Sequence, residues 1–193
     1  MRLPYVPNPP PFSTREDAAI VKRMQDRRAP RPLQSLDLTL LHSPPLADGW
    51  NSFLGAVRTK TSLGADVREL AICRVAVCNR AWVEWNHHAP LAVAAGVSKE
   101  ALEAVKQEGE LYGLKKPDQL NESQWAVLLY TDEMTRNVQV RDVTFAKLKS
   151  LFDDRGVVEI TGTAAAYNCV SRFLVALDVG EKNGTGPDDV TTH

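Results

Sequence analysis

The sequence predicts an all-α fold with seven or eight helices, and three observations support this prediction. Apolar residues recur at helical spacing along most of the chain, as with Trp50, Phe53, Leu54 and Val57. Glycine, proline and asparagine interrupt this pattern at intervals that suit the ends of helices. No stretch alternates apolar and polar residues for long enough to indicate a β-strand.

Helix-breaking residues set the predicted boundaries. Pro44 follows the first short apolar segment, and proline cannot continue a helix because it lacks an amide donor. Asn79 and Arg80 separate two longer helices, and Gly96 suits the C-terminal end of the second. Ser98 suits the N-cap of the helix that comes next. The predicted helices span 36–41, 46–59, 66–77, 81–95, 98–105, 119–136, 142–152 and 156–177.

Composition divides the chain into three parts. Residues 1–35 form a proline-rich arm, since seven of the twelve prolines lie within the first 32 residues, and this arm contains one short helical candidate at 14–25. Residues 36–178 form the helical domain. Residues 179–193 form a flexible tail that is polar and rich in helix breakers. We expect the arm to lie on the domain or on a neighbouring subunit.

Overall composition argues against several classes of function. The 193 residues carry a net charge of −1, so no surplus of positive charge indicates binding to nucleic acid or to an anionic membrane. No apolar run reaches the roughly 18 residues of a membrane span, and the first residues lack the apolar core of a signal peptide. Three cysteines are too few for a disulfide framework. We therefore expect a cytoplasmic protein.

The stretch AWVEWNHH, residues 81–88, holds the candidate site. Glu84 and His88 lie four residues apart and therefore on one face of a helix. Near the start of that helix, the helix dipole favours the ionised form of Glu84, and a carboxylate beside an imidazole raises the pKa of His88 and fixes its orientation. Trp82 and Trp85 supply an apolar wall that excludes water. This combination suits proton transfer without a cofactor.

Other interpretations of the same residues are open at this point. A Glu–His pair at this spacing is also a common surface contact with little effect on stability. His87 is the neighbour of His88 in the chain, so it lies to one side of the helix face that carries Glu84 and His88. At that position it either contacts solvent or simply packs. Glutamate and histidine also bind zinc, but the HExxH pattern and a third ligand are missing, so the sequence predicts no metal.

The segment RELAICRVAVCNRAWVEWNHHAPLAVAAGVS, residues 68–98, resembles the carboxymuconolactone decarboxylase family, which implies an AhpD-like helical fold. The resemblance rests on Arg-Glu at a helix start, a second glutamate fifteen residues after the first, a histidine four residues later and a glycine eight residues after the histidine. The motif falls on Arg68, Glu69, Glu84, His88 and Gly96.

The flanking segments SPPLADGWNSFLGAVR, residues 43–58, and VVEITGTAAAYNCVSRFLVAL, residues 157–177, are similar to the first and last helices of the family, so the resemblance covers roughly residues 36–178. The second branch of the family, the alkylhydroperoxidase D type, has a Cys-x-x-Cys motif. Its two cysteine positions fall on Ala81 and Glu84 here, so this chain lacks the dithiol.

The existing cysteines do not replace that motif. Cys73 and Cys78 lie five residues apart on one predicted helix, about 140° round its axis, so their side chains should not meet in a disulfide. We expect Cys73, Cys78 and Cys169 to be buried as small apolar residues. Thiol peroxidase chemistry is disfavoured for this reason.

The decarboxylase branch implies a lyase that removes CO2 from an unsaturated carboxylic acid or lactone without a metal or an organic cofactor. In the implied site, His88 is the proton donor or shuttle, Glu84 is its acid–base partner, and Glu69 orients it from the preceding helix. The same residues also suit dehydration, isomerisation or cyclisation. The candidate substrate-binding residues are Trp82, Trp85 and Arg80, with Arg172 as a more distant cation.

Two rival functions stay open: an alkylhydroperoxidase- or peroxiredoxin-like antioxidant protein, and a non-catalytic helical assembly module. The helix at 160–177 is apolar on nearly all sides, which favours burial against a second subunit. The resembling family forms closed homo-oligomers, so we expect a trimer or hexamer, or a dimer, with the arm around a neighbour. A small-molecule substrate is the other expected partner, and neither nucleic acid nor membrane is expected.

Overall fold

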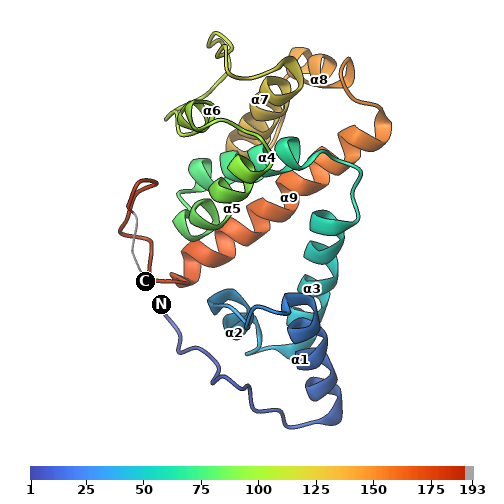
Figure 1. Ribbon diagram of the computed structural model, residues 1–193, viewed down its shortest axis with the longest axis vertical. Helices are drawn as coiled ribbons and strands as arrows, with labels where there is room; N and C mark the ends of the chain where they lie inside the picture. Colours follow the sequence, from blue (N-terminus) through green and yellow to red (C-terminus); the bar gives the residue numbers. More distant parts are fainter. Residues whose placement is uncertain (190–193) are drawn as a thin grey trace.

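The computed structural model describes residues 1–189, and these residues fold into nine α-helices without a β-strand (Figure 1). The all-α prediction is confirmed. Eight of the helices match those expected after the arm, and the remaining one is the helical candidate within it. The helices are α1 (Arg15–Arg28), α2 (Ser35–Leu40), α3 (Pro44–Thr59), α4 (Ala65–Asn79), α5 (Trp82–Ala94), α6 (Lys99–Val105), α7 (Glu122–Asn137), α8 (Asp142–Lys149) and α9 (Asp154–Leu177).

α4 lies at the centre of the domain and packs against α5, α7 and α9 (Figure 1). Ten of its fifteen residues are buried. A helix that is covered on all sides needs apolar residues on all sides, which explains why α4 has no polar stripe. The central position keeps Glu69, in the second turn of α4, away from solvent.

A sharp turn joins α4 to α5 at the predicted break. Arg80 adopts the left-handed conformation, with a φ of 53° and a ψ of 38°, which ends α4 and lets α5 begin at Trp82. Gly96 follows α5 with a φ of 94°, and the side chain of Ser98 caps α6, both as expected. Pro44 differs from expectation because it begins α3, where the missing amide of proline leaves no helical hydrogen bond unmade.

The N-terminal arm lies on the chain's own domain. The Arg2 amide donates to the Leu177 carbonyl at 2.8 Å, and Tyr5 Oη donates to Glu181 Oε1 at 2.9 Å. The start of the arm therefore lies beside the end of α9 (Figure 1). Beyond the arm, α1 packs on α3 and forms an apolar cluster with α2 around Met24. The three N-terminal helices thereby form one wall of a cavity against α5 and α9.

The segment after α9 also packs on the domain, because Trp85 Nε1 donates to the Pro187 carbonyl at 3.0 Å. The flexible tail expected at 179–193 is only partly described, since residues 190–193 lie outside the described residues. Within residues 1–189, no helix combines the length and the apolar character that crossing a membrane requires.

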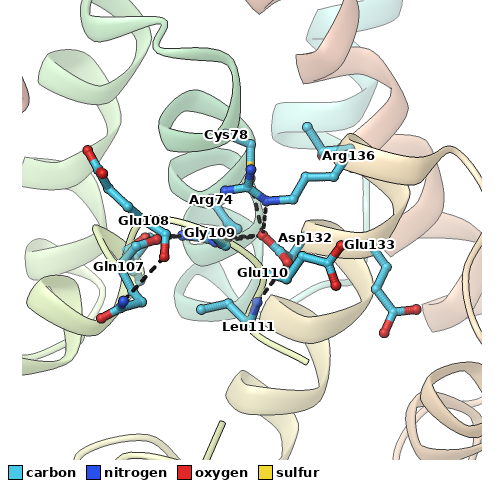
Figure 2. A network of polar contacts seen from close by, with 12 residues as sticks. Arg74, Cys78, Gln107, Glu108, Gly109, Glu110, Leu111, Asp132, Glu133 and Arg136 are labelled. Carbon is cyan, nitrogen blue, oxygen red and sulfur yellow. Dashed lines mark hydrogen bonds and ion pairs between the residues drawn. The ribbon is translucent and has the colours of Figure 1, made fainter. Parts of the chain in front are cut away.

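A buried ion pair fixes α4 against α7 (Figure 2). Arg74 Nη2 lies 2.6 Å from Asp132 Oδ1, and both side chains are at most 1% exposed. The remaining donors of Arg74 bond to the carbonyls of Val105, Gln107 and Gly109, so the loop after α6 is tied to the same pair. A buried charge is tolerated only when its hydrogen-bonding capacity is used in this way. The network therefore fixes the helix that carries Glu69.

Candidate functional site

Glu69 of α4 and His88 of α5 form a buried pair. His88 Nδ1 lies 2.6 Å from Glu69 Oε2, and each residue is 4% exposed. A carboxylate only accepts hydrogen bonds, so the proton of a neutral imidazole resides on Nδ1 and Nε2 is left as the basic nitrogen. The structure thus brings Glu69, on the preceding helix, within hydrogen-bonding distance of His88.

Burial and pairing act on the pKa values of this pair in opposite directions. Burial alone raises the pKa of Glu69, but the hydrogen bond from His88 and the charge of Arg68 outweigh it, and the pKa is lowered. For His88, burial lowers the pKa, and the hydrogen bond to Glu69 only partly opposes this effect, so the pKa is also lowered. At neutral pH the pair is therefore a carboxylate beside a neutral imidazole.

Glu84 has a different partner from the one expected. Ser171 Oγ, on α9, lies 3.0 and 3.1 Å from the two carboxyl oxygens of Glu84, and within residues 1–189 no hydrogen bond joins Glu84 to His88. Glu84 is 3% exposed, and burial raises its pKa well above the ordinary value. The expectation that the helix dipole keeps Glu84 ionised is wrong, because loss of hydration outweighs the dipole.

A cavity of about 640 Å³ adjoins these residues. Its apolar side includes Trp50 and Leu54 of α3, and Tyr167 of α9 places its ring at 84° to the His88 ring with 5.0 Å between centroids. Its polar side carries carboxyl, imidazole and guanidinium groups. The polar lining residues include Glu84, His87, His88, Arg27, Arg28 and Arg58. A largely apolar lining that also carries cations suits an organic acid.

Sequence reasoning missed the arginines that line this cavity, and Arg58 is the one among them without an ion pair in residues 1–189. It is half-buried, and no ion pair to it is found within residues 1–189, whereas Arg28 binds Asp37 through two hydrogen bonds of 2.8 and 2.9 Å. Arg58 therefore keeps its hydrogen-bonding donors for a ligand. Its only sequence signal was its place at the end of the segment that resembles the first helix of the family.

Three predicted substrate-binding residues do not line the cavity. Arg80 is exposed at the turn between α4 and α5, because the left-handed turn leaves its side chain on the surface. Arg172 is also exposed and donates to the Asn168 carbonyl at 3.1 Å. Trp82 packs against the core cluster that surrounds Leu70. Trp85 does line the cavity, as predicted.

His87 lines the same cavity, and its Nε2 is buried with no hydrogen-bond partner in residues 1–189. Its ring meets the His88 ring edge-on, with 5.0 Å between centroids. Burial, together with the charges of His88 and Arg58, lowers the pKa of His87 to about 4. At neutral pH His87 is therefore uncharged, and its buried Nε2 is a polar atom without a hydrogen bond in residues 1–189.

The cysteines are free thiols. Burial raises the pKa of Cys73 well above its ordinary value and that of Cys78 to about 12, so neither is a thiolate at neutral pH. Cys169 is exposed, which corrects the expectation that all three are buried; it lies on a face of α9 that the domain leaves uncovered. Within residues 1–189, no group of three or more histidine, cysteine or acidic side chains is placed to hold a metal ion.

Residues 44–114, which include Glu69, Glu84 and His88, match the carboxymuconolactone decarboxylase family. This segment belongs to that family. The match begins at α3 and ends beyond α6, so it contains both helices of the buried pair. No curated protein matches the chain.

Solved structures with the AhpD-like fold resemble most of the chain. An uncharacterised peroxidase-related protein from Silicibacter sp. TM1040 is 15% identical, with a TM-score of 0.69, and the match covers 94% of this chain and 95% of that one. A peroxidase-related protein from Ralstonia eutropha JMP134, described as an alkylhydroperoxidase AhpD core, is 18% identical with a TM-score of 0.67, and covers 87% and 90%.

The debrominase Bmp8, as a cysteine-to-alanine variant in complex with 2,3,4-tribromopyrrole, is 16% identical to the chain with a TM-score of 0.68. The match covers 86% of this chain and 88% of that one. At such identities these structures establish the fold and leave the reaction of this chain open.

Proposed function

We propose that the chain is a cofactor-independent lyase that acts on an unsaturated carboxylic acid or lactone, by decarboxylation or a related proton transfer. The observation that carries this proposal is the buried Glu69–His88 pair beside a cavity that also holds a buried carboxyl group and an arginine without an ion pair in residues 1–189. These are the groups that proton transfer and carboxylate binding require.

Arg58 binds the substrate carboxylate in this proposal. A guanidinium holds a carboxylate through two parallel hydrogen bonds, which fixes the direction of the bond to be broken. Trp50 and Leu54 contact the unsaturated part of the substrate and exclude water from it. His87 Nε2 provides one further polar contact for a substrate oxygen or hydroxyl.

Glu84 is the proton donor. In decarboxylation the bond between carbon and the carboxylate breaks, CO2 leaves, and the electron pair spreads into the conjugated system. Because burial keeps a proton on Glu84 at neutral pH, its carboxyl group delivers that proton to carbon. His88, held by Glu69, then relays a proton from solvent to the Glu84 carboxylate through Nε2. In an isomerisation, the neutral His88 removes one proton and Glu84 supplies another.

Thiol-based antioxidant chemistry has less support, because Cys73 and Cys78 remain protonated at neutral pH. A non-catalytic assembly role is also less well supported, since a merely structural Glu–His pair does not need a cavity of about 640 Å³ beside it. The experiment that tests the proposal measures CO2 release from a panel of unsaturated carboxylic acids and lactone acids. Turnover that depends on His88 supports the proposal; peroxide consumption that depends on a cysteine, without CO2 release, contradicts it.

A homo-oligomer, either a trimer or a hexamer with a dimer as the alternative, is part of the proposal. Leu46 and Phe53 lie seven residues apart on α3, hence on one face of it, and they are 53% and 51% exposed. Large apolar side chains that share an exposed helix face favour burial by another subunit. Light scattering tests this, since a mass near 21.3 kDa would contradict it.

A further inference from the structure

A second cavity, of about 430 Å³, lies between the end of α1, the second half of α3, the start of α4 and the end of α5. Glu69 is its only lining carboxylate in the described chain, and three of its arginines also line the first cavity. The two cavities therefore meet at a shared set of guanidinium groups. The arginines that line the second cavity are Arg27, Arg28, Arg31, Arg58 and Arg68.

The arginines exceed the nearby carboxylates in number. Five guanidinium charges face two carboxylates, Glu69 in the lining and Asp37 bound to Arg28, which leaves an excess of three positive charges. Burial and the charge of Arg28 lower the pKa of Arg27, so these like charges lie close enough to destabilise each other. An anion in the cavity would relieve that repulsion.

The shape of the cavity selects among anions. Apart from the charged residues, its lining is mostly small, with Gly55, Ala65, Ala94 and Ala95, so it suits a compact polar group better than an apolar ring. A carboxylate carries one negative charge, whereas a phosphate group carries about 1.5 to 2 at neutral pH and accepts bidentate hydrogen bonds from several guanidinium groups at once. We infer that the second cavity is a phosphate-binding site, occupied by inorganic phosphate or by the phosphate group of an organic ester.

This inference does not depend on the proposed proton transfer, because Arg31 and Arg68 line only the second cavity. The test titrates inorganic phosphate, at constant ionic strength, into the wild-type protein and into the double variant Arg31→Gln/Arg68→Gln. The double variant should bind phosphate about tenfold more weakly, since hydrogen bonds to charged groups are lost. The matched control Arg15→Gln/Arg80→Gln removes two exposed arginines outside both cavities and should change affinity by less than about twofold.

Equal weakening in the two double variants would overturn the inference, because a general loss of positive charge would then explain it. Absence of phosphate binding to the wild type, or tighter binding of malonate than of phosphate, would also overturn it. If the double variant does not fold, the single variant Arg31→Gln, at an exposed position, provides the same comparison.

Phenyl phosphate distinguishes the source of the group. Tighter binding than inorganic phosphate indicates an organic ester that extends into the first cavity, and equal binding indicates the free ion. The variant His88→Gln should retain phosphate binding although it lacks the proposed proton relay, which separates a failure of the phosphate site from a failure of the proposed function.

Discussion

His88 Nδ1 lies 2.6 Å from Glu69 Oε2 across the contact between α5 and α4. Both helices are held in place by interactions outside the site, α4 by the Arg74–Asp132 ion pair and α5 by the left-handed turn at Arg80. The orientation of the imidazole is therefore a property of the fold and does not depend on a bound ligand.

Replacing Glu69 by glutamine should lower kcat by about 100-fold with little change in KM. Glutamine is neutral and presents both a donor and an acceptor, so it no longer enforces the tautomer that keeps the proton on Nδ1 of His88. Steady-state kinetics and circular dichroism measure the effect, with the exposed Arg172→Gln as control. A kcat equal to that of the wild type would show that Glu69 is not needed to orient the imidazole.

Replacing Arg58 by glutamine should raise KM by about 10-fold to 100-fold, because a hydrogen-bonded charge pair with the substrate carboxylate is lost. The same change at Arg80 should leave KM unchanged, since Arg80 is exposed and outside the cavity. The two variants remove the same charge and thus form a matched pair. A larger rise in KM for Arg80→Gln than for Arg58→Gln would contradict this assignment. It would support Arg80, which the sequence analysis chose because it is near the site in the chain.

The contrast between these two arginines shows what the sequence predicts well. Helix positions follow from local signals, so the break before α5, the Ser98 cap and the Gly96 end agree with the structure. The contact between Glu69 and His88 was predicted because a family motif carries information about tertiary contacts. Arg80 was chosen because it is near in sequence, and nearness in sequence does not determine which side of a turn faces a cavity.

Properties that depend on burial were harder to predict. The raised pKa of Glu84 follows from its burial, which the hydrogen bond from Ser171, 87 residues further along the chain, opposes only in part. Arg58 becomes part of the site only because α3 packs between α1 and α9. No local pattern indicates either arrangement, since both arise from how distant helices pack.

His87 should make stability depend on pH between about 6.5 and 4. Its pKa is about 4 in the folded protein and 6.5 when unperturbed, so over this range the unfolded chain takes up a proton that the folded protein excludes. Stability is therefore lost as pH falls, by up to about 3 kcal/mol from this group. The variant His87→Gln should remove this contribution, as measured by urea unfolding at pH 7 and pH 4.5.

The exposed His42 provides the control for that experiment. His42→Gln should keep the wild-type difference in unfolding free energy between the two pH values, whereas His87→Gln should show a smaller difference. If both variants behave like the wild type, His87 is not held neutral by its burial.

Replacing Ser171 by alanine should move the alkaline limb of the kcat–pH profile to higher pH. Glu84 acts as a donor only while it is protonated, so activity falls as pH rises through its folded-state pKa. Burial raises that pKa, and the hydrogen bond from Ser171 partly lowers it again. Without the hydroxyl the pKa rises further, and the protonated form persists to higher pH.

The profile is measured as kcat at saturating substrate across the stable pH range, for the wild type, Ser171→Ala and Ser150→Ala. Ser150 is the exposed residue that follows α8, and among the described residues its hydroxyl bonds only to the Lys147 carbonyl, so removal of the hydroxyl should leave the pH of the alkaline limb unchanged. Glu84→Gln should lower kcat by roughly 10²-fold to 10⁴-fold and abolish the limb, because the titrating donor is gone. An alkaline limb that moves to lower pH in Ser171→Ala, or that persists in Glu84→Gln, would assign the donor role to another group. His88 would be the first candidate, because it lines the same cavity one helical turn away from Glu84.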